Sequence, residues 1–144
     1  MPKNARFILF AIAALALIAL PGCGDKDKDT KDKTTPPPLS ADLKIDVEGK
    51  GTDAKFSWDE KKFSNVKTGT VKLTVSNPAD SGEKHGIAID GGDYSNVEGV
   101  PVAPGRQTSL TVTLKPGKYK FYNSAKKFKD DKNMQGTITV VKAK

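Results

Sequence analysis

Few residues in this sequence could do chemistry, and two of them are common ligands of copper. His85 is the only histidine, and Met134 is the only methionine besides the first residue. An imidazole and a thioether suit Cu(I), and Asp130, Asp131 or Asn133 could complete a loose site around them. Two side chains rarely hold a metal tightly, so such a site would be weak or would use ligands from a partner.

Catalysis has little support in the sequence. His85 has no cysteine to activate beside it, and no serine lies in a recognisable nucleophile turn. Asp130 and Asp131 are adjacent on an extended chain, so their side chains point apart instead of forming a carboxylate pair. No helix follows the Gly91-Gly92 pair, which therefore does not predict a phosphate-binding loop. We expect no enzymatic activity.

The start of the chain has the pattern of a secretory signal. Two basic residues precede an apolar run, residues 7–20, that is too short to span a membrane easily. The LPGC motif that ends at Cys23 is similar to a bacterial lipobox, in which the cysteine receives a lipid. We expect residues 1–22 to be a signal peptide and Cys23 to be lipidated. The alternative is a cleaved signal without a lipid.

Residues 23–40 predict a tether. Four lysines and four aspartates alternate after Cys23, and no apolar residue appears until Leu39. Such a segment cannot bury enough surface to fold, and the three prolines before Leu39 stiffen it. We therefore expect an extracytoplasmic protein, attached through its lipid to the bacterial cell membrane or the outer membrane. Because Cys23 is the only cysteine, the chain can form no internal disulfide.

The remaining residues, 41–144, are enough for one modest hydrophobic core. Apolar side chains alternate with polar ones, which predicts strands with one buried face. Turn signals such as the KPGK sequence separate these runs, and no segment has a convincing amphipathic helical pattern. About seven to eight short strands are expected, in an all-β antiparallel sandwich. The clearest alternating rows are Val71, Leu73 and Val75, then Leu110, Val112 and Leu114, and finally Ile138 and Val140.

The order of these features resembles the cupredoxin family, which includes the plastocyanin-like blue copper proteins. The similar segments are GTVKLTVSN, a polar loop ending in His85, TSLTVTL, LKPGKYKFY, and a methionine followed by GTITV. They cover nearly the whole domain and match best from Thr70 to Val141. The resemblance implies a cupredoxin-like Greek-key β-sandwich, and a generic immunoglobulin-like sandwich is the alternative.

In that family, copper is bound by one histidine after the polar loop and by a cysteine, a second histidine and a methionine on a later loop. On this chain the first histidine corresponds to His85 and the methionine to Met134. The cysteine position holds Asn123, and the second histidine falls on or beside Phe128. Cys23 cannot replace the missing thiolate, because the lipid occupies it. The resemblance thus implies a degenerate copper site.

These replacements decide the expected chemistry. An amide is a weak ligand and a phenyl ring is none, so we expect no blue copper electron transfer and no cofactor. Asn123 shares a strand face with Tyr119 and Phe121, and a buried amide needs hydrogen-bond partners. We predict a polar pair between Asn123 and His85, with Phe128 filling the space of a lost ligand. Copper bound through His85 and Met134 is the alternative.

The lysine-rich loop predicts a second kind of surface. The formal net charge is +7, of which two charges belong to the signal and none to the tether. Lys126, Lys127, Lys129 and Lys132 lie at the end where cupredoxins usually meet redox partners. They predict a docking face for an acidic protein or an anionic surface, unless they only solvate the loop. We expect a monomer that binds no nucleic acid and acts as a non-redox binding or structural module of the cell envelope.

Overall fold

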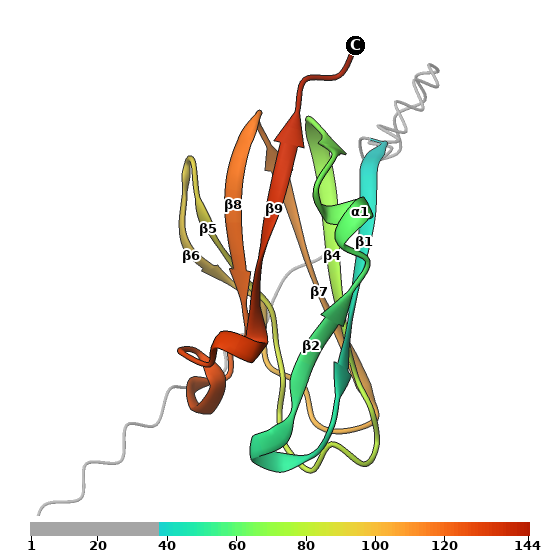
Figure 1. Cartoon of the computed structure of the whole chain (residues 1–144), viewed down its shortest axis with the longest axis vertical. Helices are drawn as coiled ribbons and strands as arrows, with labels where there is room; N and C mark the ends of the chain where they lie inside the picture. Colours follow the sequence, from blue (N-terminus) through green and yellow to red (C-terminus); the bar gives the residue numbers. More distant parts are fainter. Residues whose placement is uncertain (1–37) are drawn as a thin grey trace, which may run out of the picture. The chain divides into compact units, whose positions relative to one another are not determined.

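Two β-sheets pack face to face in the structure, a computed structural model that describes residues 38–144 (Figure 1). The first sheet has the strand order β2 (Lys55–Trp58), β1 (Leu39–Glu48), β4 (Gly69–Asn77) and β7 (Arg106–Leu114). The second has the order β3 (Val66–Lys67), β9 (Gln135–Val141), β8 (Gly117–Tyr122), β5 (Ala88–Gly91) and β6 (Tyr94–Glu98). The predicted signal peptide, Cys23 and most of the predicted tether lie outside the described residues.

Helical segments are short and lie between strands. They are α1 (Glu60–Phe63) and three single turns of 3-10 helix, η1 (Gly51–Asp53), η2 (Lys126–Phe128) and η3 (Lys132–Met134). Within residues 38–144, no helix is long and apolar enough to cross a membrane. The turns η2 and η3 matter most here, because they form the lysine-rich loop between β8 and β9.

The β-sandwich predicted from the sequence is confirmed, but it differs from the prediction in the direction and the number of its strands. Its sheets are mixed, because β1 runs parallel to β4 and β3 runs parallel to β9. Alternating hydrophobicity predicts which face of a strand is buried but not the direction of its neighbour, so the expected antiparallel arrangement holds only for the other pairs. The first strand begins at Leu39, so the last two residues of the predicted tether, 23–40, belong to β1. The strands number nine across the described part of the chain.

The core lies between the two sheets and follows the alternation in the sequence. The apolar residues of β4, Val71, Leu73 and Val75, are fully buried, and the residues between them are half-buried. From the facing sheet, Phe121 and Ile138 are also fully buried. Burying a side chain of this size stabilises the fold by about 1.5–3 kcal/mol, so these rows hold the sheets together.

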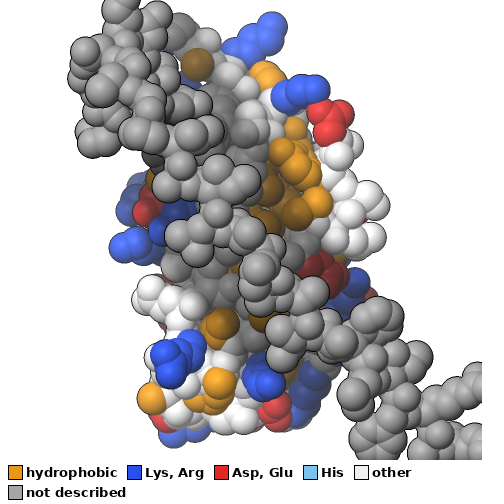
Figure 2. All heavy atoms as spheres, turned by 180° about the vertical axis from the view of Figure 1, so that it is seen from behind, with side chains coloured by type: hydrophobic (Ala, Val, Ile, Leu, Met, Phe, Trp, Pro, Cys, Tyr) orange, Lys and Arg blue, Asp and Glu red, His pale blue; other side chains and the backbone are white. Residues whose placement is uncertain are grey.

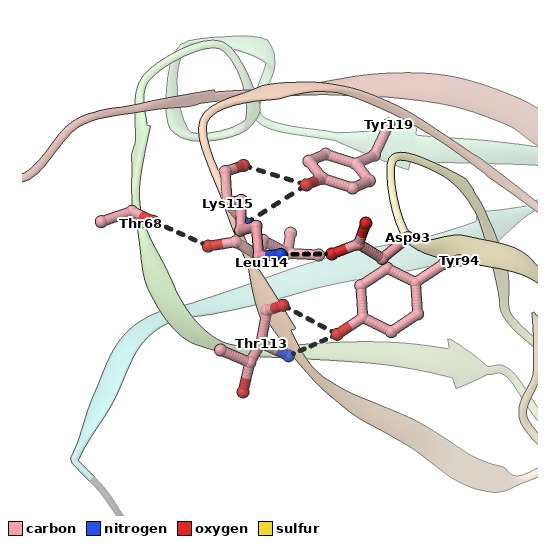
Figure 3. Close-up of polar contacts among 7 residues, drawn as sticks. All are labelled: Thr68, Asp93, Tyr94, Thr113, Leu114, Lys115 and Tyr119. Carbon is pink, nitrogen blue, oxygen red and sulfur yellow. Dashed lines mark hydrogen bonds and ion pairs between the residues drawn. The ribbon is translucent and has the colours of Figure 1, made fainter.

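Two tyrosine hydroxyls form hydrogen bonds with the backbone at the C-terminal end of strand β7, which lies at the edge of its sheet (Figure 3). The Tyr94 hydroxyl donates to the carbonyl of Thr113 at 2.7 Å and accepts from the N–H of Thr113 at 3.0 Å. The Tyr119 hydroxyl donates to the carbonyl of Lys115 at 3.0 Å and accepts from its N–H at 3.2 Å. Both tyrosines come from the other sheet, so these contacts join the two layers and satisfy edge groups that would otherwise be unpaired.

The two ends of the sandwich carry different parts of the chain. Thr68 accepts a hydrogen bond from Ser40 near the start of β1 and donates its N–H to Val141 at the end of β9. The described chain therefore begins and ends at one end of the domain. The turns η2 and η3 lie at the opposite end (Figure 1). The nine residues of β4 separate the two ends by about 30 Å, since a strand rises about 3.4 Å per residue.

The Tyr119 contacts predict a measurable contribution to stability. Changing Tyr119 to Phe removes both hydrogen bonds to Lys115 but keeps the buried ring, and should lower the free energy of unfolding by about 1–2 kcal/mol. Urea denaturation of the two proteins measures this difference. An unchanged midpoint would mean that water replaces the hydroxyl contacts at no cost.

Candidate functional site

Three polar or sulfur-containing side chains meet inside the end of the sandwich that carries η2 and η3. His85 follows the loop after β4, Asn123 follows β8 directly, and Met134 ends η3 just before β9. All three are fully buried. The loops that carry His85 and Met134 converge at one end of the sandwich. These two residues are 49 positions apart in the sequence, and both contact the amide of Asn123.

The amide of Asn123 has a defined orientation. Its Oδ1 accepts hydrogen bonds from the backbone N–H of Gly86 and of Ala125, each at 3.0 Å. An N–H group only donates, so the oxygen must face these two groups and the amino group must face the other way. There Nδ2 lies 2.8 Å from Nδ1 of His85 and 3.6 Å from Sδ of Met134. The side chain thus uses all of its hydrogen-bonding groups inside the protein.

This orientation determines the protonation of His85. Since Nδ2 of Asn123 can only donate, Nδ1 of His85 must accept, and the neutral ring carries its hydrogen on Nε2. Nε2 is buried and has no hydrogen-bond partner within the described residues. Burial lowers the pKa of His85 below its ordinary value of 6.5; Glu83 opposes this shift and Lys127 adds to it. The imidazole is therefore a neutral, buried base.

Backbone contacts hold these side chains in place. The N–H of Asn123 donates to the carbonyl of Met134 at 2.9 Å. His85 and Val102 exchange hydrogen bonds in both directions, at 3.1 and 2.8 Å. The ring of Phe128 packs against the imidazole, with 4.8 Å between the ring centroids. The cluster is a fixed part of the core, closed on one side by an aromatic ring.

The hydrogen bond predicted between Asn123 and His85 is present, and Phe128 packs beside them as expected. Three contacts of the Asn123 side chain were not predicted, those with the N–H groups of Gly86 and Ala125 and with the sulfur of Met134. The second has a sequence signal, because an asparagine side chain often accepts from the N–H two residues later in a turn. The Gly86 contact joins residues 37 positions apart, and no local pattern indicates it.

The loop carboxylates do not join the cluster. Asp131 accepts a hydrogen bond from the N–H of Asn133 at 2.8 Å, which caps the turn η3. Asp130 and Asn133 are exposed, whereas His85 and Met134 are buried. Within residues 38–144, no group of three or more His, Cys, Asp or Glu side chains could hold a metal ion. Within the described residues, no hydrogen bond joins these loop carboxylates to His85 or Met134.

The residues of the cluster do not fit a blue copper centre. Such a centre needs two imidazoles and a thiolate in one plane, with a weak axial thioether. Here the imidazole of His85 and the thioether of Met134 are present, but Asn123 offers an amide and Phe128 offers no donor atom. The amino group of Asn123 also occupies the space between the two remaining ligand-type atoms. We derive no redox step from this site.

Two of the four loop lysines are paired with glutamates from distant parts of the sequence. Lys127 pairs with Glu83, and Lys129 pairs with Glu98 at 2.8 Å. Lys126 and Lys132 are exposed and form no ion pair with other residues of the described chain. The glutamates lie 44 and 31 positions from their lysines, so the charge run in the sequence did not reveal these pairs.

A groove lies beside the cluster, at the same end of the domain. It has a volume of about 530 Å³ and is bordered by the segments 82–84, 101–104 and 125–128. Its walls combine apolar residues with charged ones. Hydrophobic, basic and acidic side chains also lie together on the surface at the lower end of the domain in Figure 2. The apolar residues are Pro101, Ala103, Pro104, Ala125 and Phe128, and the charged ones are Glu83, Lys84, Lys126 and Lys127.

Comparison with solved structures supports the architecture described above. Auracyanin B superposes with a TM-score of 0.52 and 15% sequence identity, over 72% of this chain and 91% of auracyanin B. The fold is that of the cupredoxins. This cupredoxin-like chain also matches a multicopper oxidase, with a TM-score of 0.51 and 15% identity over 73% of its length. It spans less than half of that oxidase, 45%.

Sequence comparison adds no closer relative. No family model matches this cupredoxin-like chain, and no curated protein matches its sequence significantly. At 15% identity, the structural likeness shows the fold alone. The chemistry of the site must therefore be argued from its own residues.

The lowered pKa of His85 predicts a pH-dependent stability. Unfolded His85 takes up a proton below about pH 6.5, whereas the folded protein resists protonation. The domain should therefore lose stability as the pH falls from 7.5 towards 5, and the loss ends below the folded pKa. Urea denaturation at several pH values measures it. His85→Gln, whose amide oxygen can accept from Asn123, should show a flatter profile; an equal slope would assign the effect to other groups.

Proposed function

We propose that the chain is a lipid-anchored, extracytoplasmic cupredoxin-like domain that acts as a non-redox binding or structural module of the cell envelope. The main support is the hydrogen-bonded position of Asn123. Its amide takes the place of the copper-binding thiolate and saturates the imidazole of His85 and the thioether of Met134. A site whose donor atoms already bind one another is suited to holding the protein together and not to electron transfer.

The cellular location rests on the sequence. The apolar run at residues 7–20 and the LPGC motif support export and lipidation at Cys23, and the charged segment supports a tether. Bacterial lipoproteins carry several acyl chains, which anchor more firmly than one. The anchoring membrane is then one partner of the chain.

A copper-handling lipoprotein is the second candidate, and one observation favours it. His85 Nδ1 and Met134 Sδ both lie against the same amino group, so one cluster contains two soft or borderline ligand atoms. Copper could bind to both only if the Asn123 side chain moved away. This requirement makes the candidate weaker than a non-redox module.

Copper titration separates these two candidates. We expect the purified chain to bind neither Cu(I) nor Cu(II) with sub-micromolar affinity, because its donor atoms are hydrogen-bonded. Cys23→Ser must be present in every protein measured, since a free thiol binds copper by itself. Sub-micromolar binding that disappears in both His85→Ala and Met134→Ala would overturn the non-redox proposal. An intense absorption band in the red part of the visible spectrum would do so too.

The groove supports a more specific binding role. Lys84 and Lys126 border it without an ion pair in the described chain, whereas Lys127 is neutralised by Glu83. Its apolar residues, together with Lys84 and Lys126, are complementary to an acidic protein segment or to an anionic surface. The sequence predicted a docking face made of four lysines. We restrict the proposed face to the residues that border the groove, because Lys129 lies elsewhere, with its ammonium group over the ring of Tyr122.

Salt dependence tests this docking role. Binding to polyglutamate or to phosphatidylglycerol vesicles should weaken as ionic strength rises and should fall when Lys84 and Lys126 are both changed to Gln. The matched control changes Lys67 and Lys142, two exposed lysines at the opposite end of the domain, to Gln. Equal losses in the two variants would show that net charge, and not the groove, controls association.

A further inference from the structure

The amino group of Asn123 lies where His85 and Met134 would hold a cation. We propose that Asn123 is the residue that excludes soft metal ions from this domain, and that the side chains around it form a latent site for Cu(I) or Ag(I). This inference rests on the proposed function, because it explains how the same cluster remains free of metal. It gives the side chain of Asn123 a role in metal specificity, in addition to the absence of a thiolate ligand at this position.

Two acceptor atoms converge on the amino group. Nδ1 of His85 lies 2.8 Å and Sδ of Met134 lies 3.6 Å from Nδ2 of Asn123. Both atoms offer a lone pair, and an imidazole nitrogen and a thioether sulfur are also ligands of Cu(I). A metal–nitrogen bond is about 2 Å long, so an ion bound to His85 Nδ1 would overlap the amino group. The amide and the metal ion exclude one another.

Neighbouring contacts prevent the amide from moving aside. Asn123 is fully buried, and its Oδ1 is the acceptor for the N–H groups of Gly86 and Ala125. Rotating the side chain away would leave two buried donors unpaired, which is costly in the protein interior. Exclusion of the ion therefore depends on the oxygen as well as on the nitrogen of the amide.

The two candidate ligands are held independently of the Asn123 side chain. His85 is paired with Val102 through the backbone and is covered by Phe128. The backbone of Met134 accepts from the N–H of Asn123 and donates to Asp131 at 3.0 Å. Shortening the Asn123 side chain thus leaves an imidazole nitrogen and a thioether sulfur without the donor that they shared.

Two variants remove the block in different ways. Asn123→Ala deletes the amide and vacates the space between His85 and Met134. Asn123→Asp keeps an oxygen for Gly86 and Ala125 but places a second oxygen against two other acceptors. Three acceptor atoms that face one another are stabilised by a cation, so the aspartate would act as a third ligand. Asn123→Asp also preserves the contacts that support the loop, so it decides the matter if Asn123→Ala does not fold.

Titration with Ag(I) tests the inference in the purified chain. Every protein carries Cys23→Ser, and the methyl resonance of Met134 reports whether its sulfur binds the ion. We expect the parent protein to show no stoichiometric binding. Both variants should bind Ag(I) at least about tenfold more tightly, since the ion no longer has to displace a buried, hydrogen-bonded amide. The matched control is Asn123→Ala combined with Met134→Leu, which should lose the gain.

The outcomes separate this inference from the proposed function. Tight binding by the parent protein contradicts both, because the site would then be open as it stands. If the folded variants bind Ag(I) no more tightly than the Asn123→Ala, Met134→Leu control, the inference alone is contradicted. The proposed non-redox role is then unaffected. Binding by the variants without a shift of the Met134 methyl resonance also contradicts it, because the ion would occupy another place.

Discussion

The structure of this end of the domain depends on one side chain that satisfies four partners at once. The amide of Asn123 accepts from two backbone N–H groups and donates to His85 and Met134. All of these residues are buried, so a backbone N–H or an amide group left unpaired here would cost free energy. The amide therefore fixes the positions of three segments relative to one another: the end of strand β8, the loop after β4 and the turn η3. Phe128 completes the arrangement by packing over the imidazole.

A cupredoxin-like fold brings the same strand ends together whatever side chains they carry, and the side chains decide the chemistry. In this chain the amide at residue 123 forms a hydrogen-bonded core with the imidazole of His85 and the thioether of Met134, which both accept from it. Burial lowers the pKa of His85, and the Asn123 amino group also favours the neutral ring, because a second donor cannot face it. One residue type thus sets the tautomer of the imidazole and supports its neutral state.

Features governed by local pattern were predictable from the sequence, and features governed by distant contacts were not. The alternation in β4 gave its buried face, and the shared face of Tyr119, Phe121 and Asn123 placed the amide at the end of the core. The pairing of Asn123 with His85 followed from the need to satisfy a buried amide. β1 and β3 have parallel neighbours because of how the chain crosses between the sheets. The alternation of apolar and polar residues does not encode this crossing. The partners of Lys127 and Lys129 likewise come from remote loops.

The parallel pairing of β1 with β4 has a mechanical consequence. β1 lies inside its sheet, between β2 and β4, and pairs with β4 from Leu39 to Asp46. A pull on the chain ahead of Leu39, opposed by a partner held at the far end, acts along these strands. The load then falls on many backbone hydrogen bonds in shear at the same time, instead of opening them one after another. The parallel pairing therefore makes β1 resist being pulled away from β4 along the strand direction.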